Sequence, residues 1–183
     1  MPRYLFPKPY ADFVQRLRAP SGFALVAAFA YWSEPTVRSL SMGLAVAVMG
    51  LLLRGWAAGH LEKNQRLATG GPYALTRNPL YIGTLLVAAG LAIASRQPGL
   101  AVLFAAVFGL IYLPAIELEE QHLRQLFPEY REYARDVPRL GFRLNGQGAR
   151  QSFRFALYRK NEEYKAAAGF LAGVALLVWK IYR

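Results

Sequence analysis

The chain has 183 residues, of which 55% are hydrophobic and only 18% are charged, and its formal net charge is +11. The charged fraction lies below the roughly 25% of a typical soluble domain, and the length fits a single domain over residues 1–183. No cysteine is present, which excludes disulfides and thiolate metal sites.

The basic residues lie between apolar runs and do not form a polar surface. We therefore expect the basic residues to interact with a lipid bilayer and not with a nucleic acid. Residues 1–20 have no continuous apolar stretch and no small-residue cleavage site, so we expect no signal peptide there. The first membrane helix would then act as the insertion signal.

Five apolar runs follow, and most are near the roughly 20 residues that cross a bilayer. They cover residues 21–32, 37–58, 79–95, 100–116 and 166–182. The first is short, and it fits either a longer membrane helix or half of a tight hairpin. The sequence predicts an all-α integral membrane protein with about five transmembrane helices, paired by short turns. A soluble helical protein is disfavoured, because such runs are hard to bury in a small domain.

The distribution of Lys and Arg predicts the orientation. If the N-terminus is cytoplasmic and all five runs span, only Arg38, Arg96, Lys180 and Arg183 of the 22 basic residues fall outside. We therefore expect a bacterial or archaeal cytoplasmic membrane. The polar segments after the second and fourth runs would then both face the cytoplasm.

The first polar segment, residues 69–83, reads TGGPYALTRNPLYIG. Glycine and proline at residues 70–72 predict a turn. Asn78 and Pro79 then begin a helix, with Asn78 as the cap. Free backbone N–H groups at this helix start could bind an anionic group such as a carboxylate, and Arg77 adds a positive charge. A plain junction between a loop and a helix is the alternative.

Helical periodicity continues beyond the fourth run. Residues 118–133 predict one amphipathic helix that emerges from it. Residues 141–148 predict a loop, within a connector over residues 141–165. Its second part, residues 151–165, is basic and aromatic, which fits an interfacial helix on an anionic membrane surface. A solvated connector is the alternative.

Glutamates are concentrated just after the fourth run. Carboxylates at a membrane boundary are costly unless they are paired or exposed. Glu119 or Glu120 could accept hydrogen bonds from an amine or from ribose hydroxyls. The alternative is a solvated helix face with local pairs such as Glu120 with Arg124, and Glu117 fits this alternative best.

The remaining polar residues give no familiar catalytic or metal pattern. The sequence contains no phosphate-binding loop, nucleophile elbow or zinc-protease motif. His60 and His122 are far apart, so we expect no metal site and interpret both as satisfied or interfacial side chains. Arg54, near the end of the second run, would either extend to the membrane rim or face an internal polar cavity.

Two motifs carry a resemblance to a known family. The first reads GPY at residues 71–73 and RNPLYIG at residues 77–83. The second reads EEQHL at residues 119–123, FPEY at residues 127–130 and VPR at residues 137–139. Their order and spacing, over about residues 54–140, resemble the integral-membrane methyltransferases related to isoprenylcysteine carboxyl methyltransferase and the phospholipid N-methyltransferases.

The resemblance implies an S-adenosylmethionine-dependent methyltransferase with a cytoplasmic cofactor pocket. The acceptor would be lipophilic: a prenylated carboxylate, a phospholipid amine or a small hydrophobic molecule. The resemblance identifies no catalytic base. It implies cofactor contacts, with Arg77 in a supporting role, at Gln65, Leu67, Ala68, Tyr73, Arg77, Asn78, Pro79, Tyr81 and Glu119.

Three departures from the family pattern stand out. Asn78 replaces the usual histidine, and the spacing within residues 127–130 is one residue shorter. Ala115 stands where the prenylcysteine enzymes carry an arginine that serves the substrate, which argues against a prenylcysteine carboxylate as the acceptor. Two other functions fit the same sequence: a non-catalytic membrane protein on this scaffold, and an NADPH-dependent membrane reductase, since some sterol reductases share a similar R-N-P-x-Y segment.

Overall fold

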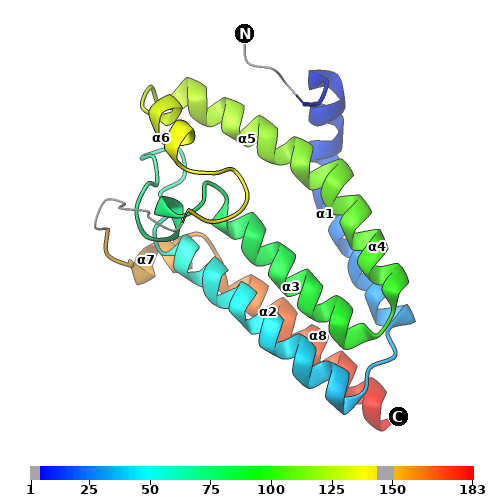
Figure 1. Cartoon of the computed structure of the whole chain (residues 1–183). Helices are drawn as coiled ribbons and strands as arrows, with labels where there is room; N and C mark the ends of the chain where they lie inside the picture. The colour runs from blue at the N-terminus through cyan, green and yellow to red at the C-terminus, as the bar shows by residue number, and fades with distance from the viewer. Residues whose placement is uncertain (1–4, 144–150) are drawn as a thin grey trace.

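The computed structural model describes residues 5–143 and 151–183, and every regular element in these ranges is a helix (Figure 1). The all-α prediction is therefore confirmed. The α-helices are α1 Lys8–Trp32, α2 Val37–Ala58, α3 Pro79–Ser95, α4 Pro98–Val107, α5 Leu113–Leu126, α6 Tyr130–Asp136, α7 Phe155–Lys160 and α8 Tyr164–Tyr182. A 3₁₀ turn, η1, covers Gly71–Ala74, and a π turn, η2, covers Phe108–Tyr112.

The apolar runs form the long helices, as predicted. Among the described residues, three stretches are long and apolar enough to cross a membrane: α2, the continuous helix Pro98–Leu126, and α8. The apolar helix α3 is shorter, at 17 residues. The first run is the C-terminal half of α1, which extends it back to Lys8. It is therefore part of a longer helix.

The helices form two groups that meet at one end (Figure 1). α2, α3 and α8 lie together, while α1 packs along α4 and α5. Residues 33–36 connect α1 to α2, and residues 96–97 connect α3 to α4, so both predicted short turns are confirmed. α2 ends, and α3 and α8 begin, at the same end of the protein. The polar segments therefore gather there.

Glycines hold α2 and α3 together. These two helices make the most extensive contact of any pair in the described chain. A Cβ atom at Gly50 of α2 would lie 2.6 Å from the carbonyl oxygen of Gly83 and 2.7 Å from the backbone nitrogen of Val87. Because these neighbours are backbone atoms of α3, they cannot move aside without separating the helices.

Replacing Gly50 by Ala is expected to destabilise the fold by about 1–3 kcal/mol, the usual cost of overpacking a close contact. Thermal unfolding in detergent measures the change. The matched control is Gly173→Ala in α8, where the added Cβ would meet no atom of another described element within 4 Å. Equal stability of the two variants would show that the α2–α3 contact is looser than described.

The fourth run continues without a break into α5, which carries polar residues to the end where the polar segments gather. Pro114 has no N–H to donate to the carbonyl of Leu110 four residues earlier, and the helix widens to the π turn η2 just before it. The hydroxyl of Tyr10 donates a hydrogen bond of 2.7 Å to that same carbonyl. This bond helps to hold the start of α1 against the π turn.

Two expectations about the segments after the fourth run need correction. The single helix predicted over residues 118–133 is wrong, because α5 ends at Leu126 and α6 begins at Tyr130. Phe127 is extended, with φ −124° and ψ 109°, as expected for a residue that precedes proline. The predicted interfacial helix is confined to α7. In the predicted loop over residues 141–148, residues 144–150 lie outside the described chain.

Candidate functional site

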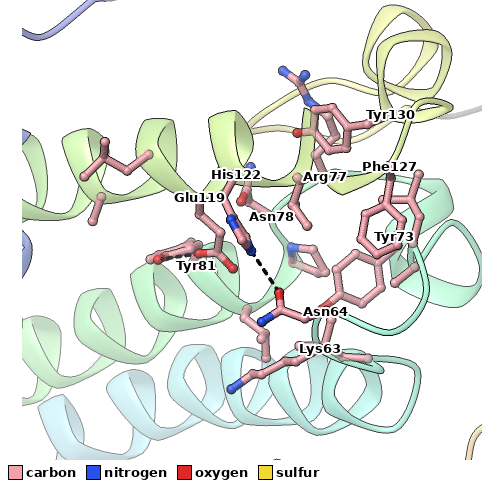
Figure 2. Close-up of a pocket in the computed structure, with 18 of the residues that line it drawn as sticks. Lys63, Asn64, Tyr73, Arg77, Asn78, Tyr81, Glu119, His122, Phe127 and Tyr130 are labelled. Atoms are coloured by element: carbon pink, nitrogen blue, oxygen red, sulfur yellow. Dashed lines mark hydrogen bonds between the residues drawn. The ribbon is translucent and has the colours of Figure 1, made fainter. Parts of the chain in front are cut away.

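A cavity of about 560 Å³ lies at the end of the protein where α2 ends and α3 begins (Figure 2). Its walls come from the loop after α2, from η1, from the start of α3, and from α5 and α6. The N-terminal half of α1 completes it. The cavity therefore lies where both polar segments meet, next to the apolar helices.

Eight of the nine residues that the resemblance assigns to a cofactor line this cavity. They are Leu67, Ala68, Tyr73, Arg77, Asn78, Pro79, Tyr81 and Glu119. The ninth, Gln65, is exposed and is not among the described residues that line the cavity. The structure therefore gathers these eight residues around one space, although 38 positions separate Tyr81 from Glu119.

Hydrogen bonds join the two motif segments directly. The backbone N–H of Arg77 donates to the carbonyl of Pro138 at 2.9 Å. The hydroxyl of Tyr133 donates to the carbonyl of Tyr73 at 2.7 Å. Through these bonds α6 and the segment after it hold the turn that precedes α3. The two segments form one structural unit beside the cavity.

Within this unit, Glu120 forms ion pairs with two arginines. Its side chain is only 3% exposed, and its Oε2 accepts hydrogen bonds from Arg139 Nε at 3.1 Å and Nη2 at 2.9 Å. Arg77 Nε lies 3.4 Å from its Oε1. The predicted local pairing of Glu120 with Arg124 is therefore wrong. Two guanidinium groups share one carboxylate, and one of them, Arg77, lines the cavity.

Asn78 begins α3 as predicted, but its side chain does not cap the helix. Instead its Nδ2 donates to the carbonyl of Arg139 at 3.0 Å. The N–H groups of Tyr81 and Ile82 both donate to the carbonyl of Asn78 at 3.1 Å. The helix start therefore offers fewer free N–H groups to an anion than the sequence led us to expect.

Glu119 faces the cavity from α5, one position before the buried Glu120. It is exposed, and its Oε2 accepts a hydrogen bond of 3.0 Å from the Tyr81 hydroxyl (Figure 2). The guanidinium of Arg18 lies over the rings of Tyr81 and Tyr112, 5.6 and 5.7 Å from their centres. A carboxylate, a hydroxyl and a cation therefore lie together on one wall.

Glu117 contradicts its predicted place on a solvated face. It is 4% exposed, and its Oε1 accepts a hydrogen bond of 2.9 Å from the backbone N–H of Leu5. The start of α1 packs over this part of α5 and excludes solvent from Glu117. Its environment is set by a segment more than a hundred positions away, which local patterns do not reveal.

The other candidate polar residues are satisfied internally. His60 is buried, with Nδ1 2.8 Å from the carbonyl of Trp56 and Nε2 3.0 Å from that of Gln151. Arg54 pairs with Glu163, the residue just before α8. Within residues 5–143 and 151–183, no cluster of three or more His, Asp or Glu side chains could hold a metal ion.

Sequence reasoning did not assign several cavity residues to a site. α1 contributes Asp12, Gln15 and Arg18. His122 projects from α5, and its Nε2 lies 3.2 Å from Asn64 Oδ1 in the loop after α2 (Figure 2). The spacing of the three α1 residues, three positions apart, is a signal that could have been used, because it places them along one helix face.

Buried tyrosines line the cavity near α6. Burial raises the pKa of the Tyr73 hydroxyl well above its usual range, and the nearby charge of Glu119 raises it further. Burial likewise raises the pKa of Tyr130 and of Tyr133. All three hydroxyls therefore stay protonated at neutral pH. They can donate hydrogen bonds but cannot serve as bases.

Comparison with known proteins places these features in a family. The profile described as phospholipid methyltransferase matches residues 38–130. This range covers α2, η1, α3, α4 and α5, and it includes the turn segment and the glutamates described above. No solved structure matches the chain at a significant level.

Three curated relatives illustrate the range of similar proteins. A cobalt-zinc-cadmium resistance protein, CzcN, of Cupriavidus metallidurans is 37% identical, over 62% of this chain and 53% of its own length. A nickel-cobalt-cadmium resistance protein, NccN, of Alcaligenes xylosoxydans xylosoxydans is 29% identical, over 85% and 70%. Protein-S-isoprenylcysteine O-methyltransferase B of Arabidopsis thaliana is 32% identical, over 54% and 56%. The chain thus spans little more than half the length of the first and third relatives.

Proposed function

Because this chain belongs to the phospholipid methyltransferase family, we propose that it transfers a methyl group from S-adenosylmethionine to a lipophilic acceptor at the cytoplasmic face of a membrane. One observation carries the proposal: eight residues that the resemblance assigns to the methyl donor line one cavity next to apolar helices. Similarity to a named isoprenylcysteine methyltransferase supports the reaction class.

The cavity residues fit the chemistry of this donor. The volume of about 560 Å³ lies within the roughly 300–1,000 Å³ of small-molecule sites. Tyr73, Phe127 and Tyr130 offer aromatic surface for an adenine ring. Glu119 offers carboxylate oxygens to an amine or to ribose hydroxyls, and Arg77 offers a positive charge to a carboxylate.

The donor supplies an electrophilic methyl group on a sulfonium, so the protein needs no covalent step of its own. Its residues align the acceptor and exclude water, and both effects lower the barrier. Tyr73 and Pro79 line the cavity and are themselves buried, so they keep solvent out of the part of the cavity that they line. Tyr81 fixes Glu119 by a hydrogen bond. The carboxylate also favours a cation in the cavity over a neutral molecule.

The acceptor belongs to one of three classes: a prenylated carboxylate, a phospholipid amine or a small hydrophobic molecule. Ala115 lines the cavity, at the position where the resemblance implies a substrate-binding arginine in the prenylcysteine enzymes. Its methyl group offers no charge to a carboxylate. This position therefore favours the other two classes.

Calorimetry tests the proposed donor site. Titration of the purified protein in detergent with S-adenosylhomocysteine, the demethylated donor, is expected to give saturable binding at one site, and NADPH is expected not to compete. A site that prefers NADPH would support the membrane reductase instead. Binding of neither ligand would favour a non-catalytic protein on the same scaffold.

Replacing Tyr81 by Phe is expected to weaken S-adenosylhomocysteine binding about tenfold, because it frees Glu119 and removes a hydrogen bond to a charged group. The matched control is Tyr112→Phe. Tyr112 packs edge-on against Tyr81, and its hydroxyl makes no hydrogen bond to the described residues. Equal dissociation constants for the two variants would contradict the assigned role of Tyr81.

A further inference from the structure

The second part of the connector leads directly into the apolar helix α8. We call residues 151–161 the basic clamp. It contains α7 and ends three residues before α8, one of the helices that is long and apolar enough to span a bilayer. Figure 1 shows α7 at the end of the protein where α2 ends and α8 begins. With α8 in the bilayer, the short link would keep the clamp at the bilayer surface.

The outer side of the clamp combines cations with an aromatic ring. Phe155 is 63% exposed, whereas Leu157 points inward and is 6% exposed. The ring of Phe153 packs against Gly59 and His60, on the inner side. Arg159 and Lys160 are also exposed, and neither forms an ion pair with a described residue. Aromatic rings favour the headgroup layer, and exposed cations are attracted by anionic lipids.

The inner side of the clamp holds the end of α2. The backbone N–H of Arg154 donates to the carbonyl of Gly59 at 3.0 Å. Asn161 Nδ2 donates to the carbonyls of Ala58 and Leu61, both at 2.9 Å. The guanidinium of Arg154 also pairs with Glu62. These bonds attach both ends of α7 to the last turn of α2 and to the loop that follows.

That loop is part of the cavity wall. We call residues 61–68 the cavity loop, because all but Gln65 line the cavity. Inside the loop, the N–H groups of Gln65 and Arg66 donate to the carbonyl of Glu62 at 3.2 and 3.3 Å. The clamp therefore contacts Leu61 and Glu62, where the loop begins. A change in the position of the clamp would shift these two residues and so the wall of the cavity.

We propose that the basic clamp docks on anionic phospholipid headgroups through Arg159 and Lys160, with Phe155 in the headgroup layer, and that this docking holds the cavity loop in place. The partner is the anionic lipid of the protein's own bilayer, because the free cations adjoin a membrane helix. Lipid composition would thereby control the order of the cavity wall.

Fluorescence quenching tests the docking. The chain has no cysteine, so Phe155→Cys creates a unique site for a fluorophore. In phosphatidylcholine vesicles that carry a spin-labelled headgroup lipid, addition of phosphatidylglycerol is expected to increase quenching of this fluorophore. The pair Arg159→Gln and Lys160→Gln should remove the increase. Quenching that does not respond to phosphatidylglycerol would overturn the docking.

A matched pair controls for total charge. Arg131→Gln and Arg135→Gln remove two exposed cations from α6, which lies outside the clamp, and this pair should keep the increase in quenching. If it loses the increase as fully as the clamp variant does, the effect belongs to net charge and the assignment to Arg159 and Lys160 is wrong.

Amide hydrogen exchange tests the link to the cavity, and it requires no methyl donor. In vesicles that contain phosphatidylglycerol, the amides of Gln65 and Arg66 are expected to exchange about fivefold more slowly than in phosphatidylcholine alone, at the lower end of typical coupling between two sites. The clamp variant should show no such difference. Equal exchange rates of the wild type in both lipids would disprove the coupling, whatever ligand the cavity binds.

Discussion

Replacing Glu120 by Ala is expected to lower the free energy of unfolding by about 3 kcal/mol. Removal of one partner from a buried ion pair typically costs about 3–5 kcal/mol, because the other charge stays buried without compensation. Arg77 would be that charge, since its side chain is only 11% exposed. Arg139 is 29% exposed and can reach water. The lower end of the range therefore applies.

The neighbouring glutamate supplies the control. Glu119→Ala removes the same side chain one position earlier, but Glu119 is exposed and its only hydrogen bond to a described residue comes from Tyr81. Thermal unfolding of both variants in detergent should show a large loss for Glu120→Ala and a small one for Glu119→Ala. Equal losses of stability would mean that the ion pairs of Glu120 with Arg77 and Arg139 do not stabilise the fold. Glu120→Gln keeps the shape and part of the hydrogen bonding, so its loss should be intermediate.

For ligand binding we expect Glu119, not Glu120, to be the more important of the two side chains. Glu119→Ala is expected to weaken S-adenosylhomocysteine binding by about tenfold to a hundredfold, the range for loss of a hydrogen bond to a charged group. The physical reason is that Glu119 presents carboxylate oxygens to the cavity while it contributes little to the fold. Calorimetry on the folded variant measures the change.

Glu132→Ala is the control for this second prediction. Glu132 is exposed on α6 and is not among the described residues that line the cavity. Its replacement removes the same charge from the same side of the protein. A Glu119→Ala variant that binds as tightly as Glu132→Ala would exclude Glu119 from the site. A double variant with Tyr81→Phe should lose less than the sum of both single losses, because the two side chains are in contact.

The sequence predicts the long helices well, because each one follows from the apolar residues of its own segment. Apolar runs near the length of a bilayer appear directly in the residues, and all five lie in helices. The break at Phe127 was also visible, since Pro128 restricts the residue before it. The helical periodicity of residues 118–133, taken alone, led to the wrong prediction of one helix in place of α5 and α6.

The site is harder to predict because distant segments define it. Helical spacing offered Arg124 as a partner for Glu120, but the actual partners, Arg77 and Arg139, come from other segments. Glu117 likewise depends on Leu5 at the start of α1. Motif resemblance grouped Glu119 with residues of the turn segment, and both line one cavity. A motif carries information about tertiary structure that residue spacing lacks.

Transfer of a labelled methyl group tests the central claim most directly. Purified protein is incubated with S-adenosylmethionine, labelled in its methyl group, and a membrane lipid extract, and mass spectrometry identifies the labelled product. We predict a lipophilic product whose formation falls with Glu119→Ala and persists with Glu132→Ala. If the wild type binds S-adenosylhomocysteine but labels no component of the extract, the claim of methyl transfer to a membrane lipid is contradicted.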